Sequence, residues 1–279
     1  MPFDNSLKNL QTPERVRALC QLVEYAPYTR EEVVQMLQPT SLNKSQDTSK
    51  QILTLALKGE LVKEREDHRL ISGMPPGAAK DPEQFRRAVI QHARQQPDLV
   101  FHRFTAWALG KGREMMVNKV DQLEILFFHE VSSKSTINRE YNDTNIRGWM
   151  TWSAYLGYGF EHNGYFLVNP ALRIEEELRF GESLVKGKPM SFRSFMQWLS
   201  LSIPELDGGV YHEQVFPGQK GKQQLSYALS AGLRTLHTQG IIKLRGVKDA
   251  SDVWFLTPSK LHEISSAVTE ITIVGGEQQ

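Results

Sequence analysis

The stretch that decides the fold is Ser49–Gly73, which reads SKQILTLALKGELVKEREDHRLISG. It predicts an amphipathic helix, a glycine, a short strand, a polar turn and a second strand. The same order recurs in Thr144–Pro170, TNIRGWMTWSAYLGYGFEHNGYFLVNP, and in Gln223–Pro258, QQLSYALSAGLRTLHTQGIIKLRGVKDASDVWFLTP. Chance similarity of strand–turn–strand segments is the alternative, but a threefold order indicates a repeated unit.

Helices are predicted before each unit. The first has a capping box, because Thr29 is followed three residues later by Glu32. Together with a preceding amphipathic stripe, this predicts helix, helix, helix, strand, strand over residues 12–73. The apolar residues that support the helices are Val16, Leu19, Cys20 and Val23 in the first unit, Val120, Leu123 and Phe127 before the second, and Phe192, Phe195, Met196 and Leu199 before the third.

Four further helices are predicted, three of them from start signals. Asn169-Pro170 and Thr257-Pro258 each combine an N-cap residue with a proline suited to the first helical turn. Leu172 and Leu178 support the first of these helices, and Leu261, Ile264 and Val268 support the second. Asp81-Pro82 predicts a helix start within residues 74–118, and Phe101, Phe104 and Trp107 indicate another helix from Asp98.

Three helices followed by a hairpin resemble a winged helix, a helix-turn-helix variant whose third helix reads DNA and whose hairpin is the wing. The chain resembles bacterial proteins built of tandem winged-helix domains. It is also similar to the DpdG proteins of the deazaguanine DNA-modification system. Such proteins are accessory components of bacterial gene clusters for DNA modification or anti-phage defence. The resemblance implies a mainly α fold with small β-hairpins, in three tandem winged-helix domains with helical connectors. The expected division is 1–73, a connector 74–118, 119–182, and 183–279 with a C-terminal helix and tail.

Composition excludes several classes of protein. The chain has 279 residues, 33 Lys and Arg against 32 Asp and Glu, and therefore a net charge of +1, which excludes a polycationic protein. A hydrophobic content of 40% is enough for packed cores. A single cysteine excludes an internal disulfide framework and a cysteine-cluster zinc site. We expect a cytoplasmic protein without a membrane partner, since no apolar run approaches a membrane span and no signal peptide is recognised.

Catalytic motifs are incomplete wherever they begin. Gly221-Lys222 lacks the phosphate-loop glycine, because Phe216 stands there, and the following Ser or Thr, because Gln223 stands there. The pairs His129-Glu130, His212-Glu213 and His262-Glu263 lack the second histidine that a zinc helix requires. Cys20 occupies an apolar stripe, which favours a buried thiol. We therefore predict no enzyme activity, no metal and no cofactor.

Aromatic residues gather between Trp149 and Phe166. Two interpretations are open, a stacking platform for bases and a packed core. The core is favoured, because Trp149 lies on the predicted inner face of a helix and Phe166 in a strand.

Basic residues are concentrated in the third unit, where residues 210–248 hold six of them against the single acid Glu213. Such a patch favours contact with DNA phosphates. Lys220, Lys222, Gln223 and Gln224 are expected at the start of the reading helix, Arg234 within it, and Lys243, Arg245 and Lys248 on the wing. The first unit contributes Lys44, Ser45, Lys50, Arg65 and Arg69, and the second Arg139 and Arg147. For each cluster a solvated face is the alternative.

We expect a non-enzymatic, DNA-binding winged-helix protein that is an accessory or regulatory component of a bacterial DNA-modification or defence system. Its expected partners are double-stranded DNA, the proteins of a multisubunit complex and a second copy in a homodimer. The rival expectation is a winged-helix protein–protein adaptor in a DNA-processing complex that dimerises and binds little DNA. The near-neutral charge and the acidic first wing favour that rival.

Overall fold

The computed structural model describes residues 7–132, 141–181, 184–219, 221–259 and 264–274. Its contacts divide the chain into two compact units, each built from two separate segments. Unit 1 comprises residues 1–101 and 124–156, and unit 2 comprises residues 102–123 and 157–279. The prediction of a mainly helical fold with small antiparallel sheets is confirmed, while the division into three winged-helix domains stays a prediction.

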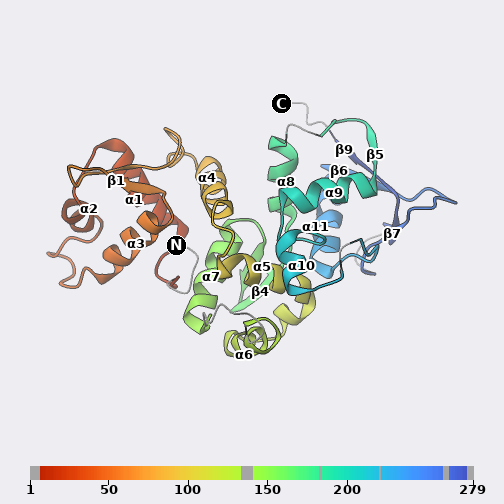
Figure 1. Cartoon of the computed structure of the whole chain (residues 1–279), viewed down its shortest axis with the longest axis horizontal. Helices are drawn as coiled ribbons and strands as arrows, with labels where there is room; N and C mark the ends of the chain where they lie inside the picture. Colours follow the sequence, from red (N-terminus) through yellow and green to blue (C-terminus); the bar gives the residue numbers. More distant parts are fainter. Residues whose placement is uncertain (1–6, 133–140, 182–183, 220, 260–263, 275–279) are drawn as a thin grey trace. The chain divides into compact units, whose positions relative to one another are not determined.

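Unit 1 begins with the predicted order of elements. The helices are α1 (Pro13–Tyr25), α2 (Arg30–Leu37) and α3 (Asp47–Lys58), and they are followed by the antiparallel strands β1 (Val62–Glu64) and β2 (Leu70–Ser72) (Figure 1). Both hydrogen bonds of the predicted capping box between Thr29 and Glu32 are present at the start of α2. The inner faces of these elements form one core, which buries Val16, Leu19, Cys20, Val33, Ile52 and Leu70.

The rest of unit 1 packs aromatic side chains onto the N-terminal segment. It contains α4 (Pro82–Arg94), capped by Asp81 as predicted, the first residues of α5 (Val100–Lys111), the end of α6 (Val120–Glu130) and α7 (Asp143–Tyr155). Trp152 of α7 is fully buried, and its indole N–H donates to the backbone oxygen of Gln11 at 2.6 Å. Trp149 is also fully buried, as is Phe166 in unit 2, so the core interpretation is confirmed for these residues, whereas Phe160 is exposed.

Unit 2 starts with the remainder of α5 and the short 3-10 helix η1 (Gly112–Met116). The hairpin of β3 (Gly159–His162) and β4 (Tyr165–Val168) leads into α8 (Ala171–Phe180). The predicted helix is present but begins one residue later than predicted, with Pro170 at the N-cap and the Asn169 side chain accepting from the backbone N–H of Ala171 at 3.2 Å. The helices α9 (Phe192–Ser202), α10 (Val210–Val215) and α11 (Tyr227–Thr238) follow.

The strands of the third repeat pair differently from the prediction. A hairpin of β6 (Ile242–Arg245) with β7 (Trp254–Phe255) was expected, but β6 pairs with β9 (Glu270–Ile273). The strand β9 also pairs with β5 (Pro189–Ser191), giving the order β5-β9-β6, while β7 pairs with β8 (Ala267–Val268) (Figure 1). The predicted hairpin is therefore wrong, because a strand further along the chain occupies the edge of β6.

The helix predicted after Thr257-Pro258 is also wrong where the structure describes it. Val268, expected on a helical face, lies in β8, whereas Leu261 and the tail from Gly275 fall outside the described residues. The segment Ala267–Val274 is rich in β-branched residues and alternates along β9, where Ile271 and Ile273 are buried. That composition and that period of two favour a strand over a helix.

Candidate nucleic-acid interface

Helix α3 of unit 1 keeps one polar face open to solvent. Its exposed residues Asp47, Lys50, Thr54 and Lys58 recur at helical spacing, while Ile52, Leu53, Leu55 and Ala56 are buried on the other side. Lys44 and Ser45 are exposed just before the helix. A twelve-residue helix is about 18 Å long, which suits insertion into the major groove of DNA.

The charges beside α3 are largely paired. Arg30 of α2 forms a bidentate ion pair with Glu64 of β1, with Nε–Oε1 at 3.1 Å, and this bond lowers the pKa of Glu64. Arg65 lies 3.2 Å from Asp67, and Arg69 donates to the backbone oxygen of Pro27. The carboxylate of Glu64 in this hairpin is therefore paired within the fold.

The second predicted reading helix, α7, is mostly buried. Asn145 contributes to the capping box of Asn142, and its amide donates to the backbone oxygen of Leu7 at 2.7 Å, so its role is structural. Arg147 is exposed, and its Nε lies 3.9 Å from Oδ2 of Asp143. Arg139 lies outside the described residues.

The third predicted reading helix, α11, is covered along nearly its whole length. From Tyr227 to His237 none of its residues is exposed, because α8 and η1 pack against it. The contact with the start of α8 is close, since a Cβ on Gly232 would lie 3.1 Å from Pro170. The prediction that α11 presents a reading face is therefore wrong for this structure.

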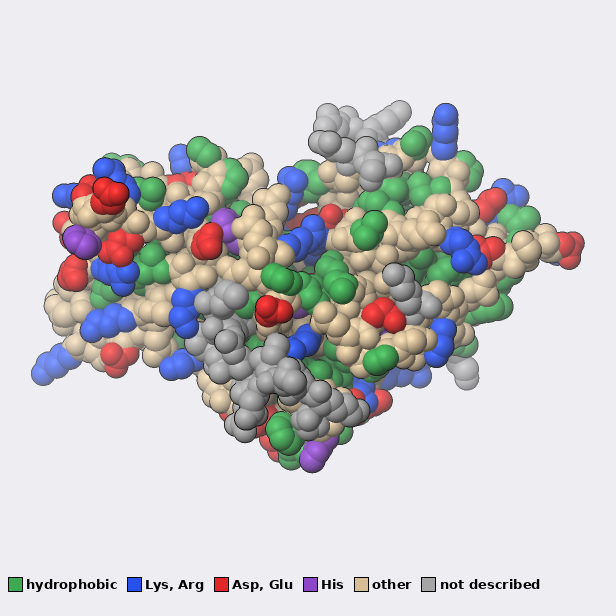
Figure 2. Space-filling model, viewed as in Figure 1, with side chains coloured by type: hydrophobic (Ala, Val, Ile, Leu, Met, Phe, Trp, Pro, Cys, Tyr) green, Lys and Arg blue, Asp and Glu red, His purple; other side chains and the backbone are tan. Residues whose placement is uncertain are grey.

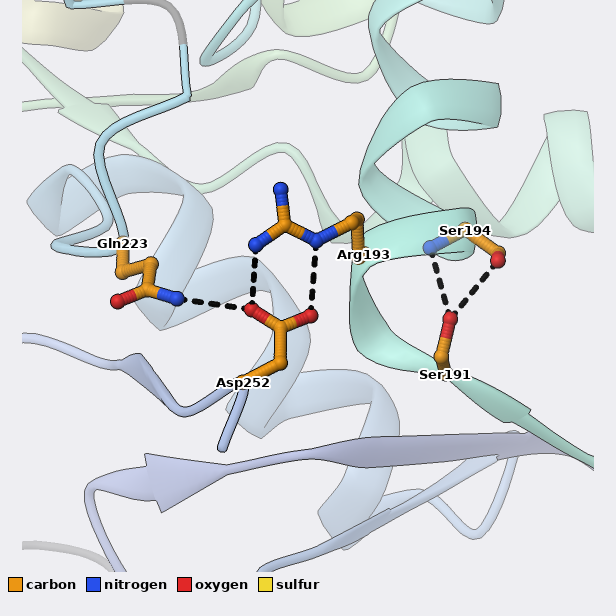
Figure 3. Close-up of polar contacts among 5 residues, drawn as sticks. All are labelled: Ser191, Arg193, Ser194, Gln223 and Asp252. Carbon is orange, nitrogen blue, oxygen red and sulfur yellow. Dashed lines mark hydrogen bonds and ion pairs between the residues drawn. The ribbon is translucent and has the colours of Figure 1, made fainter. Parts of the chain in front are cut away.

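The glutamines expected at the start of α11 precede that helix instead. Ser226 is its N-cap, and Gln223 donates to Oδ1 of Asp252 at 2.8 Å. Asp252 also receives both hydrogen bonds of Arg193, at 2.9 and 2.7 Å, which hold its pKa below the usual range (Figure 3). Gln224 donates to the backbone oxygen of Phe255 at 3.2 Å. Lys222 is exposed in the same segment, and Lys220 lies outside the described residues.

Arg234 is not a surface residue. Its side chain is only 3% exposed, within α11, and burial lowers its pKa. The expectation that it contacts phosphate is wrong, because buried atoms of a packed helix cannot reach a duplex.

Exposed basic residues occur instead at the edges of the β5-β9-β6 sheet, and we call Lys186, Lys188, Lys243 and Arg245 the basic sheet face. The exposed Lys243 and Arg245 alternate along β6 with the buried Ile242 and Leu244. Lys186 and Lys188, which the sequence reasoning missed, are exposed just before β5 on the other side of β9. Glu270 of β9 is the neighbouring acid, 4.0 Å from Arg245. Lys248 is exposed in the loop that follows.

Charge of both signs is interspersed over the surface drawn in Figure 2. This pattern agrees with the net charge of +1, so exposed basic side chains form only local groups such as the α3 face and the basic sheet face. Within the described ranges no helix meets the requirements of a membrane span.

The cysteine and two of the three histidine–glutamate pairs considered for catalysis or metal binding lie in the described parts of the structure. Cys20 is fully buried, and burial raises the pKa of its thiol. His129 is exposed and His212 is buried, while His262-Glu263 lies outside the described residues. Among the described residues no three His, Cys, Asp or Glu side chains gather as a metal site would require.

These features define a helical protein with small antiparallel sheets and a three-helix-plus-hairpin unit at its N-terminal end. The model of the DpdG-like family matches residues 7–250, so the chain belongs to that family, as the resemblance predicted. Searches of the curated proteins and of the solved structures gave no match.

Proposed function

We propose that this chain is a non-enzymatic accessory protein of a DNA-modification system that binds duplex DNA through α3. Membership of the DpdG-like family suggests the system. The observation that carries the interface is the exposed polar face of α3, since α7 and α11 are buried along most of their length. Residues 12–73 act as a winged helix in this proposal, and β1 and β2 form the wing.

The charges on α3 support phosphate contact at the edges of the groove. Lys44 and Lys50 are exposed, and among the described residues neither has a carboxylate within 4 Å. The Ser45 hydroxyl donates to Oδ2 of Asp47 at 2.9 Å, so one oxygen of this carboxylate is engaged in a hydrogen bond. Two lysine contacts contribute a slope of about −1.8 to the dependence of log K on log salt.

The test compares duplex binding of the wild type with that of Lys44→Ala combined with Lys50→Ala. We expect weaker binding and a salt slope reduced by about two. The free energy of unfolding should change by less than about 1 kcal/mol, because both side chains are exposed. The measurement is fluorescence anisotropy at several salt concentrations, with thermal melting alongside.

The matched control removes two lysines from unit 2, with Lys186→Ala and Lys243→Ala. The proposal requires a smaller loss of affinity in this variant than in the α3 variant. An equal or larger loss would place the interface on the basic sheet face. A wild type that binds no duplex at low salt contradicts the proposal and favours the adaptor.

A protein–protein adaptor is the second candidate function. Tyr25, Leu42 and Leu201 are 85%, 84% and 83% exposed, and such large apolar side chains are suited to contact with another protein. Sedimentation equilibrium over a range of concentrations tests the homodimer. A dimer weakened by Leu42→Ser, with Leu201→Ser as the comparison, would assign the contact to the segment before α3.

A further inference from the structure

Unit 2 contains a cavity of about 430 Å³ that the proposed function does not use. It lies between α9, α10 and the segment that leads into α11. Its volume is within the range of small-molecule sites. The residues that carry the argument are Arg193, Met196, His212, Phe216, Lys222 and Trp254.

The wall of the cavity is aromatic and apolar. Phe216 is half-buried, and its ring lies so close to Gly110 that a Cβ at Gly110 would overlap it. Trp254 is 5% exposed and packs against Phe192, with ring centroids 5.7 Å apart. Flat aromatic side chains of this kind stack on planar heteroaromatic rings.

A histidine also lines the cavity. His212 is 6% exposed, and its Nδ1 has no hydrogen-bond partner among the described residues. Its ring lies 5.3 Å from that of Phe216, between centroids. His212 and Phe216 therefore form one wall of the cavity.

Two cations border the same cavity. The bidentate bond to Asp252 fixes the guanidinium of Arg193, whose third nitrogen points away from that carboxylate (Figure 3). Lys222 is exposed on the loop. The acid at the cavity, Asp207, accepts from the backbone N–H and hydroxyl of Ser226 at 2.7 and 2.6 Å, so both of its oxygens are engaged at the start of α11.

We propose that this cavity binds one nucleotide, with the base against Phe216 and Trp254 and the phosphate near Arg193 and Lys222. Aromatic walls and two cations together match a base that carries a phosphate. A free mononucleotide and an unpaired base of DNA share this chemistry.

The test measures binding of dAMP, dGMP, dCMP and dTMP to the full chain by isothermal titration calorimetry. We expect at least one of them to bind more tightly than 2-deoxyribose 5-phosphate and inorganic phosphate. If 2-deoxyribose 5-phosphate or inorganic phosphate binds as tightly as the mononucleotides, the proposal is overturned, because the cavity would then be an anion site only. The absence of binding at millimolar concentration of every mononucleotide overturns it as well.

Two matched pairs of variants test the assignment. Phe216→Ala should weaken nucleotide binding about tenfold, while Phe160→Ala, which removes an exposed aromatic ring from β3, should leave it unchanged. Lys222→Ala should weaken binding of the nucleotide but not of its nucleoside, and Lys248→Ala should change neither. Equal effects within either pair contradict the site.

Two DNA probes separate the sources of the base. If a duplex with one bulged nucleotide competes with the mononucleotide and a fully paired duplex does not, the site accepts an unpaired base of DNA. If neither competes, it accepts the free nucleotide. The α3 variant should keep nucleotide binding, and Phe216→Ala should keep paired-duplex binding, so each proposal can fail without the other.

Discussion

Single residues decide how the helices end. The helix α11 ends through Gly240, which has φ +76°, and the N–H of Ile241 then bonds the oxygen of Leu236. In α3 the equivalent residue is Glu60, with φ +57°, and the N–H of Leu61 bonds the oxygen of Ala56. The glycine recognised in the first repeat, Gly59, therefore stands one residue too early, and a glutamate adopts the left-handed conformation.

We predict opposite effects of exchanging these residues. Glu60→Gly should raise the free energy of unfolding by about 1 kcal/mol, because it removes the cost of a left-handed side chain. Gly240→Ala should lower it by a similar amount, since nothing lies within 4 Å of the added Cβ and only the backbone cost remains. Urea denaturation measures both, and changes of the same sign would contradict this account.

A second prediction at the residue scale concerns the buried pair of His102 and Glu205. Each is 3% exposed, and Nδ1 of His102 lies 2.7 Å from Oε1 of Glu205, while Tyr211 stacks on the imidazole at 4.5 Å. Burial alone would raise the pKa of Glu205, but His102 and the nearby Arg173 outweigh it and hold that pKa below its usual range. The carboxylate therefore contributes stability above pH 4.5, which is lost as the pH falls through the lowered pKa.

His102→Ala should lower the free energy of unfolding at neutral pH by about 3–5 kcal/mol, because it leaves a buried carboxylate without its main partner. The sign of the acid dependence should also reverse. With burial dominant, the pKa of Glu205 rises above its unfolded value, so stability is lost as the pH rises through it. The double variant His102→Leu, Glu205→Leu should be much less destabilised. Urea titrations at several pH values distinguish these outcomes, and equal loss in both variants would show that packing alone matters.

At the scale of elements, β9 joins strands that are far apart in the sequence. Its residue Ile271 is fully buried between β5 and β6, whereas Thr272 is only half-buried on the other side of the strand. Ile271→Ala should lower the free energy of unfolding by about 2–5 kcal/mol. Thr272→Ala should change it by about 0.5 kcal/mol, and thermal melting of both variants tests the difference.

Elements with local signals were predicted from the sequence. The starts of α2 and α4 depend on Thr29 and Asp81, which bond backbone groups two or three residues away, so a short window contains the whole interaction. The pairing of β9 is not local, because its register depends on strands tens of residues away. This is why Lys186 and Lys188 were missed, although they precede a strand of the same sheet as Lys243.

The sequence of α11 contains a signal of its burial, but the basic residues in and around this helix obscured it. The helix has small residues on more than one face, namely Ala228, Ser230, Ala231 and Gly232. Such a distribution is typical of a helix that is packed closely on several sides. The amphipathic pattern of α3 is different, because charged or polar residues recur on one face only. Local charge density therefore ranked the third unit above the first for DNA contact, whereas α3 is the more exposed of the two helices.

At the scale of the whole molecule, the two compact units are interleaved along the chain. Unit 1 is interrupted by residues 102–123, which belong to unit 2. Within unit 1, α7 supplies contacts that reach the N-terminal segment, including the bonds from Trp152 to Gln11 and from Asn145 to Leu7. The expected first domain of residues 1–73 therefore has part of its packing surface covered by α7.

This interleaving sets an order of events during protein synthesis. The buried indole of Trp152 is made 141 residues after Gln11, the residue whose backbone oxygen it binds. At about 5–20 residues per second, the ribosome needs roughly 7–28 s to add that intervening length of chain. Throughout that interval the nascent N-terminal helices expose the surface that α7 later covers.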